Sequence, residues 1–197
     1  VVVERDALGV PVITASSLED LVLAQGYVTA QDRLWQMDLT RRAPAGELAE
    51  IVGRAALATD IENRTYGFRQ AAEASLAIMD AEMKGLLEAY ARGVNLYMEH
   101  HQSRLPLEFR VLGYQPRPWT PVDTLLVHAY MYEVLTTTWR WELSRARVQA
   151  IVGPERAREM YAVESPLDHF IVGEEKAGEA PARPGKPSPL PPPSSMK

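Results

Sequence analysis

Few residues of this chain could do chemistry by themselves. It has no cysteine, which excludes a thiol nucleophile, a disulfide framework and a zinc–cysteine site. Of its four histidines, His100 and His101 end a predicted helix, where a cation suits the helix dipole, so we expect them at the surface. His128 lies in an apolar helical stretch and is expected to be a hydrogen-bonded core residue. His169 lies near the C-terminal tail, and no pair of histidines has the spacing of a metal site.

The motifs that usually mark an active site are also absent from the sequence. It contains no G-x-S-x-G nucleophile elbow, no H-E-x-x-H zinc motif, no G-x-G-x-x-G fingerprint and no phosphate-binding loop. Its net charge of −5 provides no basic surface for nucleic acid. No apolar run approaches the ~20 residues of a membrane span. We therefore expect neither nucleic acid as a partner nor a membrane-spanning segment.

The N-terminal part of the chain predicts a hairpin followed by helices. Val1–Glu4 and Val10–Ala15 are rich in β-branched residues and flank a turn-like tetrapeptide, which is typical of two short strands. Ser17 has the position of a helix cap and begins a helical stretch. A second helical stretch follows and is expected to end at Ala43, because the residue before Pro44 is pushed out of the α region.

The clearest helix is predicted over 81–101, with Asp80 as its cap and a single apolar stripe along it. An irregular link is expected over 105–119, where prolines and a glycine interrupt the chain. Two shorter helices are predicted near the C-terminal end, over 142–152 and 155–161.

Thr120 begins the helix with the strongest start signal in the sequence. Pro121 stands in its first turn and Asp123 three residues after the cap. The helix body over 125–135 is almost continuously apolar and is expected to be buried on most sides. A lone hairpin is marginally stable without a further strand to pair with. The sequence therefore predicts that this chain is part of a larger fold whose main sheet lies elsewhere.

The C-terminal stretch 174–197 differs in composition from the rest. Seven of the chain's fifteen prolines fall between Pro181 and Pro193. Such a segment buries little and is typical of a linker or a polyproline II tail, and less often of a ligand for a recognition domain. We therefore divide the chain into residues 1–173 and a proline-rich tail, which we interpret as a spacer peptide.

Several phrases of the sequence resemble those of a known family. They are R-D-x-x-G-V-P from Arg5, A-Q-D-R-L-x-Q-M from Ala30, the Arg41–Arg42 pair, L-x-A-Y-A-x-G-V-N from Leu87 and P-W-x-P-x-D from Pro118. Over residues 2–152 the chain resembles the α subunit of the penicillin acylase family of N-terminal nucleophile hydrolases. This family includes penicillin, cephalosporin and N-acyl-homoserine-lactone acylases.

The resemblance implies an α+β, four-layer αββα fold, to which this chain gives mostly helices and the hairpin. It also implies an amidohydrolase that is active only with a β subunit, whose N-terminal serine is the nucleophile and whose α-amine takes the proton. The substrate would be a small-molecule acyl amide of the β-lactam or acyl-homoserine-lactone type. No catalytic residue is expected in this chain, since Val1 has no side-chain nucleophile. A periplasmic or secreted location is implied, and because the chain begins without methionine we expect a removed leader or a trimmed start.

The resemblance also implies roles for three residues, counted without gaps from the P-W-x-P-x-D phrase. Tyr132 and Thr136 fall where the family's helix meets the acyl group, and they share one helix face at i, i+4. Plain core packing explains the same pattern equally well. Glu142 falls where an α-chain carboxylate helps to hold a structural Ca²⁺ ion shared with the β chain. Alternatively, it is a solvated residue paired with Arg145 at i+3. Thr136 is smaller than the aromatic residue typical of phenylacetyl-selective members, which favours a roomier acyl pocket.

A function of another class is compatible with the residues alone. The chain could be a non-catalytic helical binding module that uses its proline-rich tail as a ligand. A partner chain that begins with serine would distinguish the acylase from this module.

Overall fold

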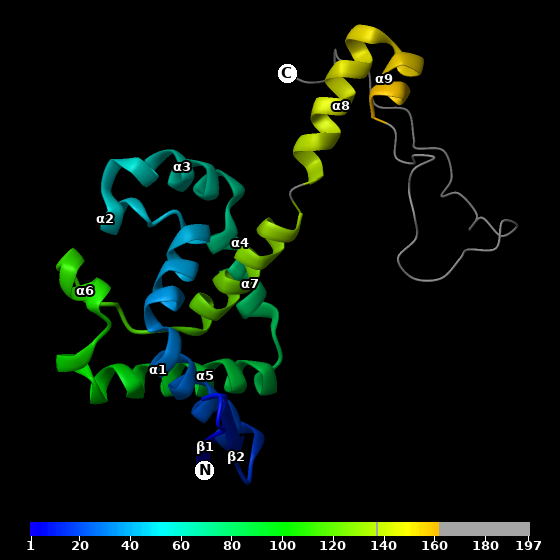
Figure 1. The fold of residues 1–197 in the computed structure, drawn as a ribbon. Coiled ribbons are helices and arrows are strands. Elements are labelled where there is room, and N and C mark those ends of the chain that lie inside the picture. The colour runs from blue at the N-terminus through cyan, green and yellow to red at the C-terminus, as the bar shows by residue number, and fades with distance from the viewer. Residues whose placement is uncertain (137, 162–197) are drawn as a thin grey trace, which may run out of the picture. The chain divides into compact units, whose positions relative to one another are not determined.

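The computed structural model describes residues 1–136 and 138–161, which fall into two compact units, Val1–Arg140 and the part from Trp141 onward. The first unit consists of a small hairpin and a set of helices (Figure 1). Its elements are β1 (Val2–Arg5), β2 (Pro11–Thr14), α1 (Leu18–Ala45), α2 (Ala49–Val52), η1 (Gly53–Ala56), α3 (Leu57–Tyr66), α4 (Phe68–Ile78), α5 (Ala81–His100), η2 (Gln102–Arg104), α6 (Leu107–Leu112), α7 (Pro121–Leu135) and the start of α8 (Thr138–Val152). The predicted mostly helical chain with an N-terminal hairpin is confirmed. His169 and the predicted tail 174–197 lie outside the described residues.

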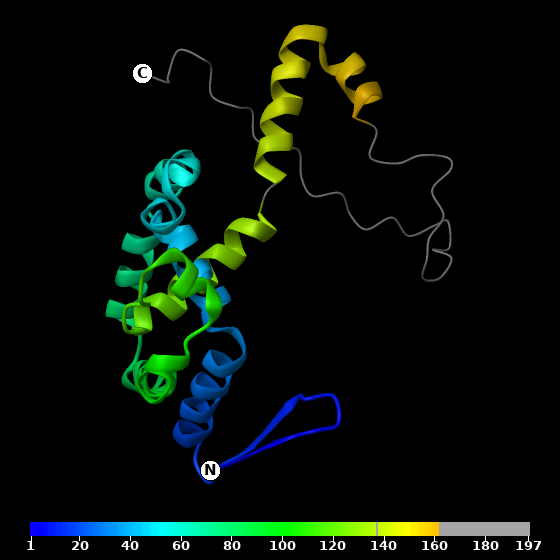
Figure 2. The same ribbon diagram turned by 60° about the vertical axis from the view of Figure 1, so that its left-hand side comes forward.

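The hairpin is built by local hydrogen bonds and is attached to α1 by an arginine. β1 and β2 pair antiparallel, and the Asp6 carboxylate closes the turn by accepting the backbone N–H groups of Leu8 and Val10 at 2.9 and 2.8 Å. Arg5 donates two hydrogen bonds to Asp32 on α1, at 2.7 and 3.1 Å. In residues 1–136 and 138–161 the sheet consists of these two strands, which extend away from the helices (Figure 2).

Helix α1 unites the two helical stretches expected before residue 43. Ser17 caps it as predicted, because its side chain accepts the N–H of Asp20 at 3.1 Å. The helix is locally broken at Arg33, where φ is −141° and ψ is 18°. The end predicted before Pro44 is wrong by two residues. Pro44 lies inside the last turn, and Gly46, at φ +67°, closes the helix by donating its N–H to the carbonyls of that turn.

Helices α1 and α5 cross at two glycines and form the main core (Figure 1). Asp80 caps α5 as predicted by accepting the N–H of Met83 at 2.8 Å. A Cβ atom added at Gly93 would lie 1.9 Å from the carbonyl oxygen of Leu23, and one at Gly26 would lie 2.2 Å from that of Tyr90. The two backbones therefore touch, and no larger residue fits at either position. The buried residues of this core are Ala30, Leu34, Met37, Ala91, Val94, Tyr97, Phe109 and Trp119.

Helix α6 corrects the prediction that 105–119 is irregular. A proline precedes its first residue, and Gly113, at φ +71°, ends it, which is the usual asymmetry of helix termini. Its Phe109 side chain is 2 % exposed and packs edge-on against Trp35 at 5.3 Å between ring centroids. One buried aromatic residue between a proline and a glycine therefore stabilises a short helix that has too few residues to show a periodic pattern.

Helix α7 is buried at one end and exposed at the other. Asp123 and Leu126, in its first two turns, are 0 % exposed. The large apolar side chains of its last two turns are exposed by 49–72 %, namely Met131, Tyr132, Val134 and Leu135. His128 is exposed as well, so the expected core histidine is wrong. The expected burial on most sides is wrong for the described residues, because these four large apolar side chains of the C-terminal half of α7 are left exposed.

The second unit comprises the rest of α8 and α9 (Pro154–Met160). Gly153, at φ +86°, separates these helices, and α9 begins at Pro154, one residue before the predicted start at 155. Helix α8 begins four residues earlier than the predicted start at Glu142. None of the helices within residues 1–136 and 138–161 combines the length and the apolar character needed to cross a membrane.

Candidate functional site

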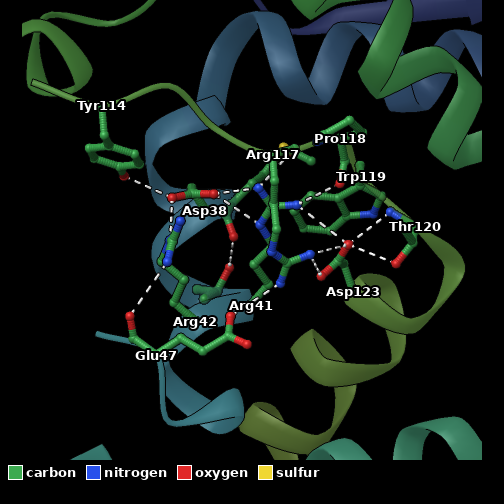
Figure 3. Close-up of polar contacts among 12 residues, drawn as sticks. Asp38, Arg41, Arg42, Glu47, Tyr114, Arg117, Pro118, Trp119, Thr120 and Asp123 are labelled. Atoms are coloured by element: carbon green, nitrogen blue, oxygen red, sulfur yellow. Dashed lines mark hydrogen bonds and ion pairs between the residues drawn. The ribbon is translucent and has the colours of Figure 1, made fainter. Parts of the chain in front are cut away.

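A buried network of charged side chains lies between α1, the link before α7 and the first turn of α7 (Figure 3). On α1, Asp38 is flanked by arginines three and four residues further on. Its Oδ1 accepts from Arg41 at 2.5 and 2.9 Å, and its Oδ2 accepts from Arg42 and from the hydroxyl of Tyr114 at 2.8 Å each. Asp38 and Arg41 are 1 % exposed and Arg42 is 5 % exposed. The carboxylate is therefore fully paired without water.

Arg41 connects α1 with the segment that leads into α7. Its guanidinium donates to the backbone carbonyls of Arg117 at 2.8 Å and Pro118 at 3.3 Å, and to Asp123 at 3.4 Å. It also lies over the Trp119 ring, 5.0 Å from the ring centroid. Only a guanidinium supplies this many donors in one plane.

Asp123 is the point at which α7 is attached. Its Oδ2 accepts the N–H and the hydroxyl of Thr120 at 2.8 Å each, and these residues form the predicted capping box. Arg117 donates to its Oδ1 at 2.8 Å and to its Oδ2 at 3.1 Å. The carboxylate thus caps its own helix and is bound by two arginines at the same time.

Asn95 fixes the same segment from α5. Its side-chain amide donates to the carbonyl of Trp119 at 2.9 Å and accepts the N–H of that residue at 2.7 Å. The indole N–H of Trp119 donates to Thr124 on α7 at 2.9 Å. The backbone before α7 is therefore held from α1 through Arg41 and from α5 through Asn95.

The paired charges shift the pKa values of the network. Burial alone would raise the pKa of Asp38, but the charge of Arg41 and the hydrogen bonds from Arg42 and Tyr114 outweigh it, so this pKa lies below its ordinary value. Burial, followed by the hydrogen bond to Asp38, raises the pKa of the Tyr114 phenol. Asp38 therefore remains ionised at neutral pH, with Tyr114 as a neutral donor to it.

Sequence reasoning did not assign a role to this network. Its signal is present in the chain, because Asp38, Arg41 and Arg42 follow one another at i, i+3 and i+4 within a buried stretch of α1. The partners on the link and on α7 lie 76 to 82 residues away. Spacing along one helix does not reveal such distant partners.

The two residues predicted to contact an acyl group lie together at the C-terminal end of α7. The hydroxyl of Thr136 donates to the backbone carbonyl of Tyr132 at 2.6 Å, and its N–H bonds to the same carbonyl at 3.0 Å. Tyr132 is 64 % exposed. Within this chain Tyr132 is therefore not a core residue, and its ring is accessible to a ligand or to another chain.

A pair of carboxylates lies near this end of α7. Glu133 is half-buried, and its Oε2 atom has no hydrogen-bond partner among the described residues. Burial and the charge of Glu62 raise the pKa of its carboxyl. Glu62 itself accepts hydrogen bonds from Tyr66 and Arg140. Arg140 thereby pairs with Glu62, whereas Glu133 has no ion pair among the described residues.

Glu142, the predicted calcium ligand, lies on α8 in the second unit and is exposed. Its exposure fits the alternative of a solvated helix residue as well as it fits a metal ligand. Its carboxylate is a hard oxygen ligand of the kind that Ca²⁺ accepts. No group of three or more metal-ligating side chains occurs in the part of the chain that the structure describes. Glu142 could thus supply one ligand, and a complete site would need oxygen atoms from elsewhere.

Comparison with known proteins identifies a consistent set of relatives. The family model described as penicillin amidase matches residues 1–185. The acyl-homoserine lactone acylase QuiP of Pseudomonas aeruginosa is 37 % identical over 154 residues, which are 78 % of this chain and 18 % of that protein. The penicillin acylase 2 proenzyme of Pseudomonas sp. (strain SE83) is 37 % identical over 155 residues, 79 % of this chain and 20 % of that protein. The chain therefore spans about a fifth of the length of these curated relatives.

A solved structure matches the fold. A chain of the thermostable penicillin G acylase from Alcaligenes faecalis superposes with a TM-score of 0.71 and 28 % identity, over 88 % of this chain and 96 % of that chain. The two chains are thus of similar size and share one arrangement of helices.

Proposed function

Since this chain belongs to the penicillin amidase family, we propose that it is the α subunit of a heterodimeric acylase. The reaction is the hydrolysis of the amide bond of an N-acylated small molecule, of the β-lactam or acyl-homoserine-lactone type. One observation carries the proposal. The chain corresponds to 96 % of one chain in the penicillin G acylase structure but to about a fifth of the relatives' full length. A second, larger chain therefore completes the enzyme.

The complete fold is then the four-layer αββα arrangement, with the main sheets in the β chain. Two features of the described residues support this view. The hairpin strands β1 and β2 pair only with each other in the described chain, which leaves two strand edges for further pairing. The C-terminal half of α7 exposes four large apolar side chains. Exposed apolar side chains gathered at one place are typical of an interface.

The chemistry of the proposed enzyme takes place on the β chain. The hydroxyl of its N-terminal serine attacks the amide carbonyl carbon while the α-amine of the same residue accepts the proton. The leaving amine takes a proton as it departs, and water then hydrolyses the acyl-serine ester. The present chain contributes binding. Tyr132 and Thr136 form part of the wall against which the acyl group packs, and neither takes part in proton transfer.

Calcium is proposed as a structural ion shared between the two chains. Glu142 supplies one carboxylate from this chain, and the β chain supplies the remaining oxygen ligands that a six- to eight-coordinate ion needs. The ion would neutralise the carboxylates gathered around it and hold the chains together.

A periplasmic or secreted location completes the proposal. It rests on the family resemblance alone. Fractionation of cells that express the full reading frame tests this point, because the activity is expected in the periplasmic or culture fraction.

The central experiment expresses the complete reading frame and analyses the purified protein. Two chains are expected, one containing the residues of the present chain and the other with an N-terminal serine, as read by N-terminal sequencing or intact mass. The mature protein is expected to release free acid from N-acyl amides, and replacing that serine by alanine should abolish release. Purification of a single chain without a partner and without hydrolysis would refute the proposal.

A further inference from the structure

The end of α7 that carries Tyr132 and Thr136 is less covered by the described chain than the opposite end of the helix. In the last two turns Glu133 is half-buried but the large apolar side chains are exposed, whereas Asp123 and Leu126 in the first two turns are fully buried. A helix is stiff over fifteen residues, so a small change in direction or rotation at its start displaces the far end. The attachment of Asp123, together with the packing of Leu126, therefore influences where this chain presents Tyr132 and Thr136.

The attachment is more specific than a helix cap requires. The Thr120–Asp123 capping box by itself satisfies the free N–H groups of the first turn. Arg117 and Arg41 add three contacts to the same carboxylate, at 2.8, 3.1 and 3.4 Å. These contacts approach from different elements, so they fix the rotation of α7 about its axis as well as the position of its start.

We propose that Asp123, Arg41 and Arg117 are positioning residues that set the acyl-chain selectivity of the enzyme by orienting α7. They touch neither substrate nor reacting atoms and act through Tyr132 and Thr136. This inference rests on the proposed function, because it needs those two residues to line the acyl pocket. A displacement of about 1 Å in a binding group can change turnover by as much as about 100-fold, so a modest reorientation is measurable.

Asp123→Asn is the main variant, and Asp60→Asn is its matched control. Asp60 is likewise a buried carboxylate, 4 % exposed, that accepts backbone N–H groups at a helix start, those of Leu48 and Ala49 at 3.0 and 2.7 Å. It does not contact α7 in the described structure. Both variants remove one negative charge from a buried carboxylate that accepts backbone N–H groups, but only Asp123→Asn alters the contacts that attach α7.

The readout is the ratio of kcat/KM for a short and a long straight-chain acyl amide, measured on the mature two-chain enzyme. Asp123→Asn is expected to change this ratio by at least about 5-fold, mainly through KM, and Asp60→Asn to leave it within about 2-fold. Should Asp123→Asn not mature, Arg117→Gln serves in its place. Arg117 is half-exposed, and its loss leaves the capping box intact. A smaller change in the same direction is expected.

Thr136→Phe separates failure of this inference from failure of the proposed function. A changed ratio in Thr136→Phe together with an unchanged ratio in both Asp123→Asn and Arg117→Gln would overturn the positioning role and leave the pocket in place. An unchanged ratio in all three variants would contradict the proposal that Tyr132 and Thr136 line the acyl pocket. Equal changes in Asp60→Asn and Asp123→Asn would show that general loss of stability is responsible, which also overturns the inference.

Discussion

Replacement of Gly93 by alanine tests the helix crossing on which the fold depends. The new Cβ atom would lie 1.9 Å from the carbonyl oxygen of Leu23, against 3.4–4 Å for ordinary van der Waals contact. The obstacle is backbone rather than a flexible side chain, so α1 and α5 must separate. Overpacking of a core usually costs about 1–3 kcal/mol, and a displaced backbone places this site at the upper end.

Gly85→Ala is the matched control on the same helix. A Cβ atom there meets nothing within 4 Å, so the substitution gains helix propensity, about 1 kcal/mol, without a clash. Gly93→Ala has the same gain in propensity. This shared gain cancels in the comparison, so the two variants are expected to differ in unfolding free energy by the overpacking cost, about 1–3 kcal/mol and toward the upper end, with Gly85→Ala above the wild type and Gly93→Ala below it.

The assay is urea unfolding of the mature protein, followed by tryptophan fluorescence and circular dichroism. Gly26→Ala provides a second test, because its Cβ would lie 2.2 Å from the carbonyl oxygen of Tyr90 in the same crossing. One separation of the helices relieves both clashes, so the double variant should be less destabilised than the sum of the single ones. The reasoning is refuted if Gly93→Ala unfolds at the same urea concentration as Gly85→Ala or a higher one.

Three further predictions concern the acyl pocket, the calcium ion and the buried network. Thr136→Phe should shorten the preferred acyl chain in a kcat/KM series, since each misplaced methylene is worth ~1–3 kcal/mol, whereas an unchanged chain-length profile would place Thr136 outside the pocket. Glu142→Ala should reduce bound calcium and the yield of mature enzyme while the pH dependence of turnover stays the same, and equal calcium content would remove the assignment. The pKa of Asp38 is depressed in the folded protein, so its stabilising contribution is present above the unfolded pKa of about 3.9 and is lost as the pH falls through the folded value. Asp38→Asn should cost about 3–5 kcal/mol at pH 7 and flatten the loss of stability at acid pH, and parallel pH profiles would contradict this account.

Local chemistry made several elements predictable from the sequence. The caps at Ser17, Asp80 and Thr120 were identified from residue types at fixed offsets, because a capping side chain bonds to the backbone only two or three residues away. The turn before β2 was predicted for the same reason. Such contacts need no knowledge of the rest of the fold.

Burial was predicted less well, because apolar periodicity does not say which chain provides the cover. The stripe along α5 faces α1 in the same chain, and its prediction is confirmed. The apolar body of α7 shows an equally strong signal, but its last two turns are exposed here. His128 is exposed for the same reason. Apolar patterning thus predicts which side chains favour burial, but it does not predict whether the described residues bury them.

The phrases that carry the family resemblance explain why the fold is identified more sharply than the substrate. The buried network that attaches α7 contains Asp38, Arg41 and Asp123. On α5, Gly93 allows close contact with α1, and Asn95 binds the link before α7. All of these residues help to determine the position of the backbone. Tyr132 and Thr136 lie beyond the last phrase, on the part of α7 that the network orients but does not contact. The same supporting network is therefore compatible with different side chains at the end of α7. The relatives that match this chain include a penicillin acylase proenzyme and an acyl-homoserine lactone acylase. If Tyr132 and Thr136 line the acyl pocket as proposed, substrate preference depends on these residues together with the proposed second chain, which is why selectivity ratios, rather than activity alone, are the informative measurement.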